Sequence, residues 1–224
     1  MRYKPFLFVL LLSGTLFSQA TTIVASRPTH YLFTPTAYVN EPYHLVLGFR
    51  EISYAFPGNL QIQASLFDNI GRINLGAKYG VAENMAIGAG MAHSLMYPWT
   101  GGHGIRRYHS PRFGIFFTLG VVQNPEMEAA LTFHSQIGNS FSVGCDFGLK
   151  YTPVDVWSFM AEVGTSFNLS EPRFYLNTIG GIRIHPPNLP FLNFDLGINL
   201  TEFSPGSGVN IGVYIDFIFA MITM

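Results

Sequence analysis

The chain is poor in cysteine and in charged residues. Cys145 is the only cysteine among 224 residues, so no disulfide can form within the chain. Asp, Glu, Lys and Arg make up 11% of the residues, whereas soluble domains contain about 25%. The 12 basic and 13 acidic residues give a net charge of -1, which excludes the strongly basic surface that nucleic acid requires.

Long apolar runs are missing as well. Beyond residue 20, no stretch of about 18 residues is apolar throughout, which argues against membrane-spanning helices. Yet hydrophobic residues make up 48% of the chain and the mean hydropathy is +0.27, values that a soluble protein with so few charges would tolerate poorly. These properties together favour a membrane β-barrel, whose strands spread their apolar residues by alternation.

The first twenty residues differ from the rest. Arg2 and Lys4 precede an apolar run from Phe6 to Leu12, and small residues follow at Ser18 and Ala20. This arrangement is typical of a secretory signal peptide cleaved after Ala20. We therefore expect residues 1–20 to be a signal peptide and residues 21–224 to form one barrel domain. The alternative is an ordinary N-terminal core helix.

Apolar and polar residues alternate along most of the remaining chain. Leu60–Leu66 is one example, with apolar residues at every second position. Because successive strand side chains point to opposite faces, each such run has one apolar face and one polar face. Between turn sequences such as Pro57-Gly58-Asn59, the pattern predicts twelve strands, with ten as the alternative, over residues 31–39, 43–55, 60–67, 72–81, 85–94, 113–122, 127–136, 141–152, 157–167, 173–184, 191–200 and 209–219.

The predicted fold is all-β, an antiparallel up-and-down transmembrane β-barrel. The first predicted strand contains Pro35, which cannot donate a ladder hydrogen bond, so residues 31–39 are alternatively a plug inside the barrel. The longest connection, residues 95–112, is expected outside the cell, with both chain ends in the periplasm. Aromatic side chains at the periplasmic ends of the outward faces then form an interfacial girdle of Tyr79, Tyr151 and Trp157.

Two short segments resemble known barrels. The segment Lys78–Gly90 resembles a hairpin common in bacterial outer-membrane β-barrel proteins, and Leu32–Tyr38 is similar to the start of some barrels linked to extracellular polysaccharide. The resemblance implies a bacterial outer-membrane location, contact with membrane lipid and lipopolysaccharide, and insertion by the barrel-assembly machinery. The chain departs from this class at its end, because it finishes on Met224 rather than on an aromatic residue.

Charged residues at inward positions are the main candidate functional residues. Ionisable groups at membrane depth must pair or face water. They therefore either line a narrow channel for small polar solutes or form an ion-paired core that braces a closed barrel. The predicted lumen-facing charges are Arg72, Lys78, Glu128, Asp146, Lys150, Glu162, Arg183, Asp195 and Asp216. The predicted lipid-facing residues include Phe147, Leu149, Phe194, Leu196 and Ile215.

The connection before residue 113 is basic. Its guanidinium groups match the geometry of lipopolysaccharide phosphates or of an anionic solute. The alternative is a solvated loop without a ligand. Its candidate residues are His103, Arg106, Arg107, His109 and Arg112. The histidines have no partners at metal-ligand spacing, so neither a metal nor any other cofactor is predicted.

Two alternatives belong to other function classes. A membrane-embedded lipid-modifying hydrolase or acyltransferase needs a Ser–His pair, but the adjacent pairs His93-Ser94 and His134-Ser135 point to opposite faces of a strand. No enzyme activity is therefore expected, although a pair formed across strands would restore that alternative. A soluble secreted β-sandwich would instead bury one face of each strand between two sheets.

Overall fold

In the computed structural model the described part of the chain is all-β. It comprises residues 22–23, 34–48, 51–64, 72–94, 111–138, 140–170, 172–189, 192–201 and 210–223. The strands are β1 (Thr22–Ile23), β2 (His44–Gly48), β3 (Ile52–Phe56), β4 (Leu60–Ala64), β5 (Arg72–Ala82), β6 (Met85–Ser94), β7 (Arg112–Gln123), β8 (Met127–Ile137), β9 (Phe141–Val154), β10 (Trp157–Asn168), β11 (Arg173–Ile184), β12 (Asn193–Thr201) and β13 (Asn210–Thr223). Among these residues, no helix is long and apolar enough to span a bilayer.

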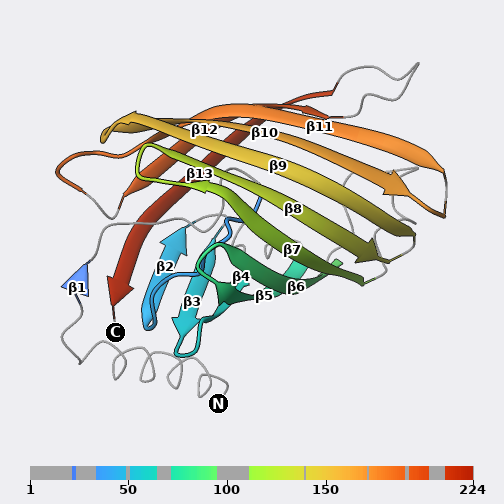
Figure 1. Ribbon diagram of the computed structural model, residues 1–224, viewed down its shortest axis with the longest axis horizontal. Helices are drawn as coiled ribbons and strands as arrows, with labels where there is room; N and C mark the ends of the chain where they lie inside the picture. The colour runs from blue at the N-terminus through green and yellow to red at the C-terminus, as the bar shows by residue number, and fades with distance from the viewer. Residues whose placement is uncertain are drawn as a thin grey trace, which may run out of the picture.

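Each strand from β2 to β13 pairs antiparallel with the next along the chain, so the sheet runs up and down without crossovers. In addition, the last strand pairs with β2, with Met221 opposite Val46, and with the two-residue β1. The strands of residues 44–56 and the end of β13 therefore meet although they lie far apart in sequence (Figure 1). All described strands belong to one sheet, which does not fit a two-sheet sandwich.

The two faces of the sheet differ sharply in exposure. Along β10, Trp157 is 37% exposed and Phe159 is 45% exposed. Their neighbours on the opposite face are buried, with Ser158 0% exposed and Glu162 4% exposed. We call the buried face the inner face and the exposed one the outer face. This alternation follows from the period of two in the sequence.

The inner face is polar and the outer face is apolar. Among the described residues, the buried side chains include fifteen polar or charged ones and only nine hydrophobic ones. Thirty large hydrophobic side chains are exposed, most of them at outward strand positions. A soluble domain shows the opposite distribution, because burial of apolar area drives its folding.

Two of the predicted strands are wrong. Residues 34–40 form no ladder apart from one bridge at Pro35, and instead lie against the inner face. Residues 43–55 are not one strand, because β2 and β3 form a hairpin in which Val46 faces Ser53. Two predictions were open for residues 31–39, a strand and a plug. The plug fits the described residues from Thr34 onward better than the strand.

The other predicted strands agree with the observed ones to within a few residues, and β13 continues to Thr223. Residues 65–67 of the predicted strand 60–67 lie outside the described residues. The predicted turn Pro57-Gly58-Asn59 joins β3 to β4, and both Gly58 (φ 81°) and Asn59 (φ 64°) adopt the left-handed conformation. Asn and Gly accept this conformation at little cost. Residues 1–20, the predicted signal peptide, lie outside the described residues.

The predicted exposure can be followed residue by residue. Phe147 is exposed, whereas Leu149, Phe194 and Leu196 are half-buried. The side chain of Ile215 lies outside the described part.

The pairing of β13 with β2 can be tested by cross-linking. Leu47 and Ala220 are Cα partners, and neighbouring antiparallel strands lie within the Cα separation that a disulfide spans. In a Cys145→Ser background, the Leu47→Cys/Ala220→Cys variant should form an intramolecular disulfide, seen as a mobility shift on non-reducing gels. The control Leu47→Cys/Val213→Cys moves one cysteine seven residues along β13, roughly 23 Å, and should not cross-link. Equal cross-linking of both variants would contradict the pairing.

Candidate functional site

A short stretch of chain crosses the inner face of the sheet. We call Thr34–Asn40 the N-terminal segment. The backbone N–H and the Oγ1 hydroxyl of Thr34 both donate to Oε2 of Glu162 on β10, at 3.1 and 3.0 Å. The Nζ of Lys78 on β5 donates to Oγ1 of Thr36 at 3.1 Å. All four residues in these bonds are buried.

The second half of the segment contacts two further strands. The hydroxyl of Tyr38 donates to Oε2 of Glu128 on β8 at 3.4 Å. The backbone N–H of Asn40 donates to Oε1 of Gln61 on β4 at 3.0 Å. One segment of seven residues thus bonds to β4, β5, β8 and β10, which is possible only because the sheet curves around it.

Glycines on the inner face make room for the segment. A Cβ added at Gly80 would lie 3.3 Å from Val39, and one added at Gly120 would lie 3.2 Å from Ala37. Both distances are tighter than ordinary van der Waals contact, so larger side chains at these positions would push the segment away.

The remaining inner charges form pairs. Arg183 on β11 donates from Nε and Nη2 to the two carboxylate oxygens of Asp195 on β12, both at 2.7 Å, and each side chain is 4% exposed. The Arg183–Asp195 bonds have the bidentate geometry in which a guanidinium binds a carboxylate most strongly. Separately, Lys150 Nζ bonds to Glu128 Oε1 at 2.8 Å.

A third pair joins His134 to Asp146 at 3.2 Å, with both side chains 28% exposed. The structure thus places seven of the nine predicted lumen charges on the inner face. The two others, Arg72 and Asp216, lie on β5 and β13, but their side chains are outside the described part.

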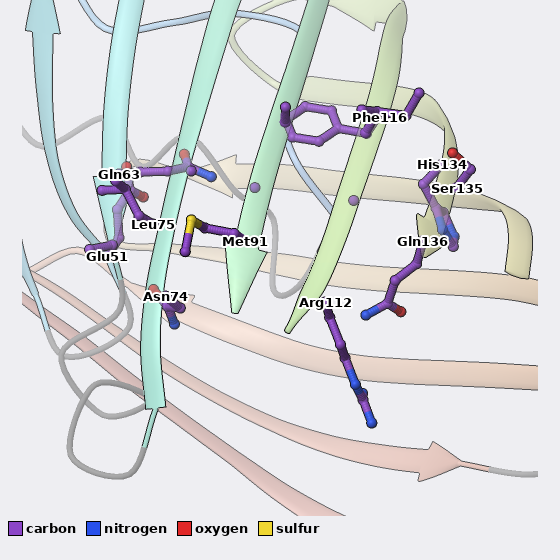
Figure 2. Close-up of a pocket in the computed structure, with 16 residues that line it drawn as sticks. Glu51, Gln63, Asn74, Leu75, Met91, Arg112, Phe116, His134, Ser135 and Gln136 are labelled. Carbon is purple, nitrogen blue, oxygen red and sulfur yellow. The ribbon is translucent and has the colours of Figure 1, made fainter. Parts of the chain in front are cut away.

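An open hollow remains beside the N-terminal segment. It has a volume of about 420 Å³ and lies over Gly76, Gly90 and Gly114, at the end of the sheet where β7 begins (Figure 2). Its polar lining residues are Glu51, Gln63, Asn74, Arg112, His134, Ser135 and Gln136, and Phe116 adds an aromatic ring.

The predicted basic connection is only partly described. Arg112 is exposed at the first position of β7 and lines the hollow. His103, Arg106, Arg107 and His109 lie outside the described residues.

The three girdle residues are all exposed on the outer face: Tyr79 is 44%, Tyr151 45% and Trp157 37% exposed. Tyr151 and Trp157 lie on either side of the β9–β10 turn, where Tyr151 is the Cα partner of Phe159. The Trp157 ring packs edge-on against Phe159 with centroids 4.4 Å apart. The aromatic surface thus continues across both strands.

A Ser–His pair that the sequence did not reveal lies at this same end of the sheet. Ser158 Oγ lies 3.1 Å from His185 Nε2 and 2.8 Å from the hydroxyl of Thr152. The register of β10 with β11 sets Ser158 opposite Arg183, which brings His185 within reach. Only the strand pairing could have predicted this contact. Burial lowers the pKa of His185, and the neighbouring Arg183 lowers that pKa further.

Among the described residues, no three His, Cys, Asp or Glu side chains gather in a way that could hold a metal ion. No family model and no curated protein matches the chain. Among solved structures, a bacterial polysaccharide outer membrane secretin is similar, with a TM-score of 0.48 and 10% identity, over 83% of this chain and 77% of the other. This likeness assigns neither a family nor an activity to the chain.

The Arg183–Asp195 pair predicts a large effect on stability. Asp195→Asn leaves a buried guanidinium without its counter-charge, which should lower the free energy of unfolding by about 3–5 kcal/mol. Urea unfolding in detergent micelles, followed by tryptophan fluorescence, would measure this loss. Asp155→Asn in an exposed turn is the matched control and should have little effect. Similar midpoints for the two variants would refute a bracing role for the pair.

The lowered pKa of His185 predicts a pH dependence. Because the folded state disfavours the imidazolium, His185 contributes full stability above its unfolded pKa of about 6.5 and loses it as the pH falls from there toward the folded pKa. The thermal midpoint of the wild type should therefore fall more between pH 8 and pH 5.5 than that of His185→Gln. Parallel curves for the two proteins would show that His185 does not carry this dependence.

Proposed function

We propose that this chain is a bacterial outer-membrane β-barrel that acts as a narrow channel for small polar solutes and is closed at rest by the N-terminal segment. The observation that carries the proposal is the reversed polarity of the sheet, with a polar inner face crossed by a short bonded segment.

A transmembrane barrel accounts for the outer face. In lipid, every backbone polar group must be paired within the protein and the lipid-facing side chains must be apolar. The strands from β5 to β13 have nine to fourteen residues, enough to cross a bilayer when tilted. The pairing of β13 with β2 supports closure of the sheet, because it leaves neither of these strands as a free edge.

The location follows from the same reasoning. We propose export by a signal peptide over residues 1–20, insertion by the barrel-assembly machinery, and contact of the outer face with membrane lipid. Tyr79, Tyr151 and Trp157 would then lie at the periplasmic interface, where amphipathic rings are favoured. Arg112 and the basic connection before it would face lipopolysaccharide outside.

The interior supports a closed resting state. The segment satisfies the buried Glu162 carboxylate and Lys78 ammonium, and the Arg183–Asp195 pair braces the adjoining wall. If the segment leaves, both groups lose these hydrogen bonds, and water entering the interior would replace them. Departure of the segment would thus favour hydration of the interior.

A hydrolase is the second candidate, favoured by the Ser158–His185 contact. A nucleophile must meet its substrate, yet Ser158 is 0% exposed and lines neither the inner hollow nor the larger apolar groove on the outer face. We therefore propose a structural role for this pair, which ties the end of β10 to the residue after β11, and no enzymatic activity for the chain.

The gate can be tested in planar bilayers. Replacing Thr34–Asn40 by a Gly/Ser linker of equal length removes the side chains that fill the interior. The wild type should be nearly silent, and the linker variant should show steady conductance. Gly/Ser replacement of the exposed turn residues Pro187, Asn188 and Leu189 is the control and should stay silent. A linker variant that folds and inserts but does not conduct would reject the channel and leave a structural barrel.

A further inference from the structure

The inner face carries an unusual row of glycines. Gly76 on β5, Gly90 on β6 and Gly114 on β7 are Cα partners across three neighbouring strands. The row is flanked by Gln63 on β4 and Gln136 on β8, which are the next Cα partners on either side. Across these three strands the inner face therefore exposes backbone without side chains, with a glutamine side chain at each end of the row. This backbone forms the floor of the hollow.

The packing of the described residues does not require Gly90 and Gly114, whereas a Cβ at Gly76 would lie 3.2 Å from Cγ of Gln63. A Cβ at Gly90 would come no closer than 3.5 Å to any described neighbour, and one at Gly114 would meet a single carbonyl oxygen at 3.5 Å. These are ordinary contacts, unlike those at Gly88 and Gly144, where a Cβ would collide with the Phe116 ring and the His134 ring. The absence of side chains at the floor thus keeps space open rather than relieving crowding.

The walls around this floor are suited to hydrogen bonding. Figure 2 shows Gln63 and Glu51 on one side of the hollow and Gln136 with His134 on the other. Amides both donate and accept hydrogen bonds, and Phe116 offers an apolar face. The Oε1 atom of Gln63 is buried and has no hydrogen-bond partner within the described residues, so it can accept a hydrogen bond from a bound molecule.

The charged groups of the hollow occur in opposite signs. The Glu51 carboxylate, which accepts hydrogen bonds from Ser53 and Gln61, lies at the β3 side, and the Arg112 guanidinium lies at the β7 side. His134 is paired with Asp146. No single sign dominates, so the field of the hollow does not favour either a cation or an anion. A volume of about 420 Å³ lies within the usual range for small-molecule pockets, about 300–1,000 Å³.

We propose that the hollow over Gly76, Gly90 and Gly114 binds a small solute that is uncharged overall and both donates and accepts hydrogen bonds. Polyhydroxyl compounds and zwitterions share this chemistry. The inference deepens the proposed function, since it names the class of solute that the channel would select. The binding itself does not depend on conduction, because the hollow is open beside the N-terminal segment in its closed position.

Three probes with one carbon skeleton test the charge rule. Sorbitol is neutral, gluconate carries one negative charge and glucamine carries one positive charge. Binding to the full-length protein in detergent micelles is measured by saturation-transfer difference NMR, with glutamine added as a zwitterionic probe. We expect the signal of sorbitol, of glutamine or of both to exceed the signals of the two ions at least fivefold. Ions that bind as well as the neutral probes, or four probes that all fail to bind, would overturn the proposal.

Filling the hollow tests the location. Gly90→Leu and Gly114→Leu each place a side chain over the floor and should abolish the signal of the binding probe. Gly180→Leu adds the same bulk at an exposed position with open space around it and should leave the signal unchanged. Gly90→Ala and Gly114→Ala, with circular dichroism, cover the case in which a leucine variant does not fold. Equal loss in the Gly180 variant, or full binding in the two floor variants, would place the site elsewhere.

The two proposals fail in different ways. Probe binding without conductance in the linker variant would leave the solute site and reject the channel. Conductance of that variant without probe binding would leave the channel and reject the solute site.

Discussion

A charged side chain buried on the inner face needs a partner inside the protein, and this requirement shapes the interior. The outer face of each strand is apolar, so the polar side chains between the apolar ones converge on a common interior. A charge there is costly unless it is paired. Arg183 accordingly forms a bidentate pair with Asp195, and Lys150 pairs with Glu128. Glu162 accepts hydrogen bonds from both the backbone N–H and the hydroxyl of Thr34.

Glycine serves this interior in two distinct ways. At Gly88 and Gly144 it lets a ring from the neighbouring strand, Phe116 or His134, pack directly against the backbone. At Gly90 and Gly114 no described side chain fills the space that the missing side chain leaves. The first use allows close packing of the sheet, and the second leaves a volume open at the next inward position along β6. A sequence shows both as inward glycines, and only the positions of neighbouring side chains distinguish them.

The period of two predicted most of the strands because it reports directly on which face each residue occupies. It failed at residues 34–40, since a segment lying across a polar interior alternates much as a strand does, and Pro35 was the only residue that argued against a ladder. It failed again at residues 43–55, where no Pro-Gly or Asn-Gly signal marks the turn between β2 and β3. The Ser158–His185 contact depends on the register of β10 with β11, and that register is a property of the paired sheet rather than of either strand's sequence.

The segment and the hollow are close enough to influence one another. Gly76 and Lys78 are successive inward positions on β5, about 7 Å apart, and Lys78 bonds to Thr36 of the segment. The segment is held mainly by a few hydrogen bonds, and those to charged groups contribute about 1.5–3 kcal/mol each. A ligand that binds the two positions of the segment unequally would therefore shift the balance between them by an amount equal to its difference in affinity. By linkage, the segment would change the affinity of the hollow by the same factor. In the proposed channel, a solute that prefers the open position would promote its own passage, while one that prefers the closed position would keep the channel shut.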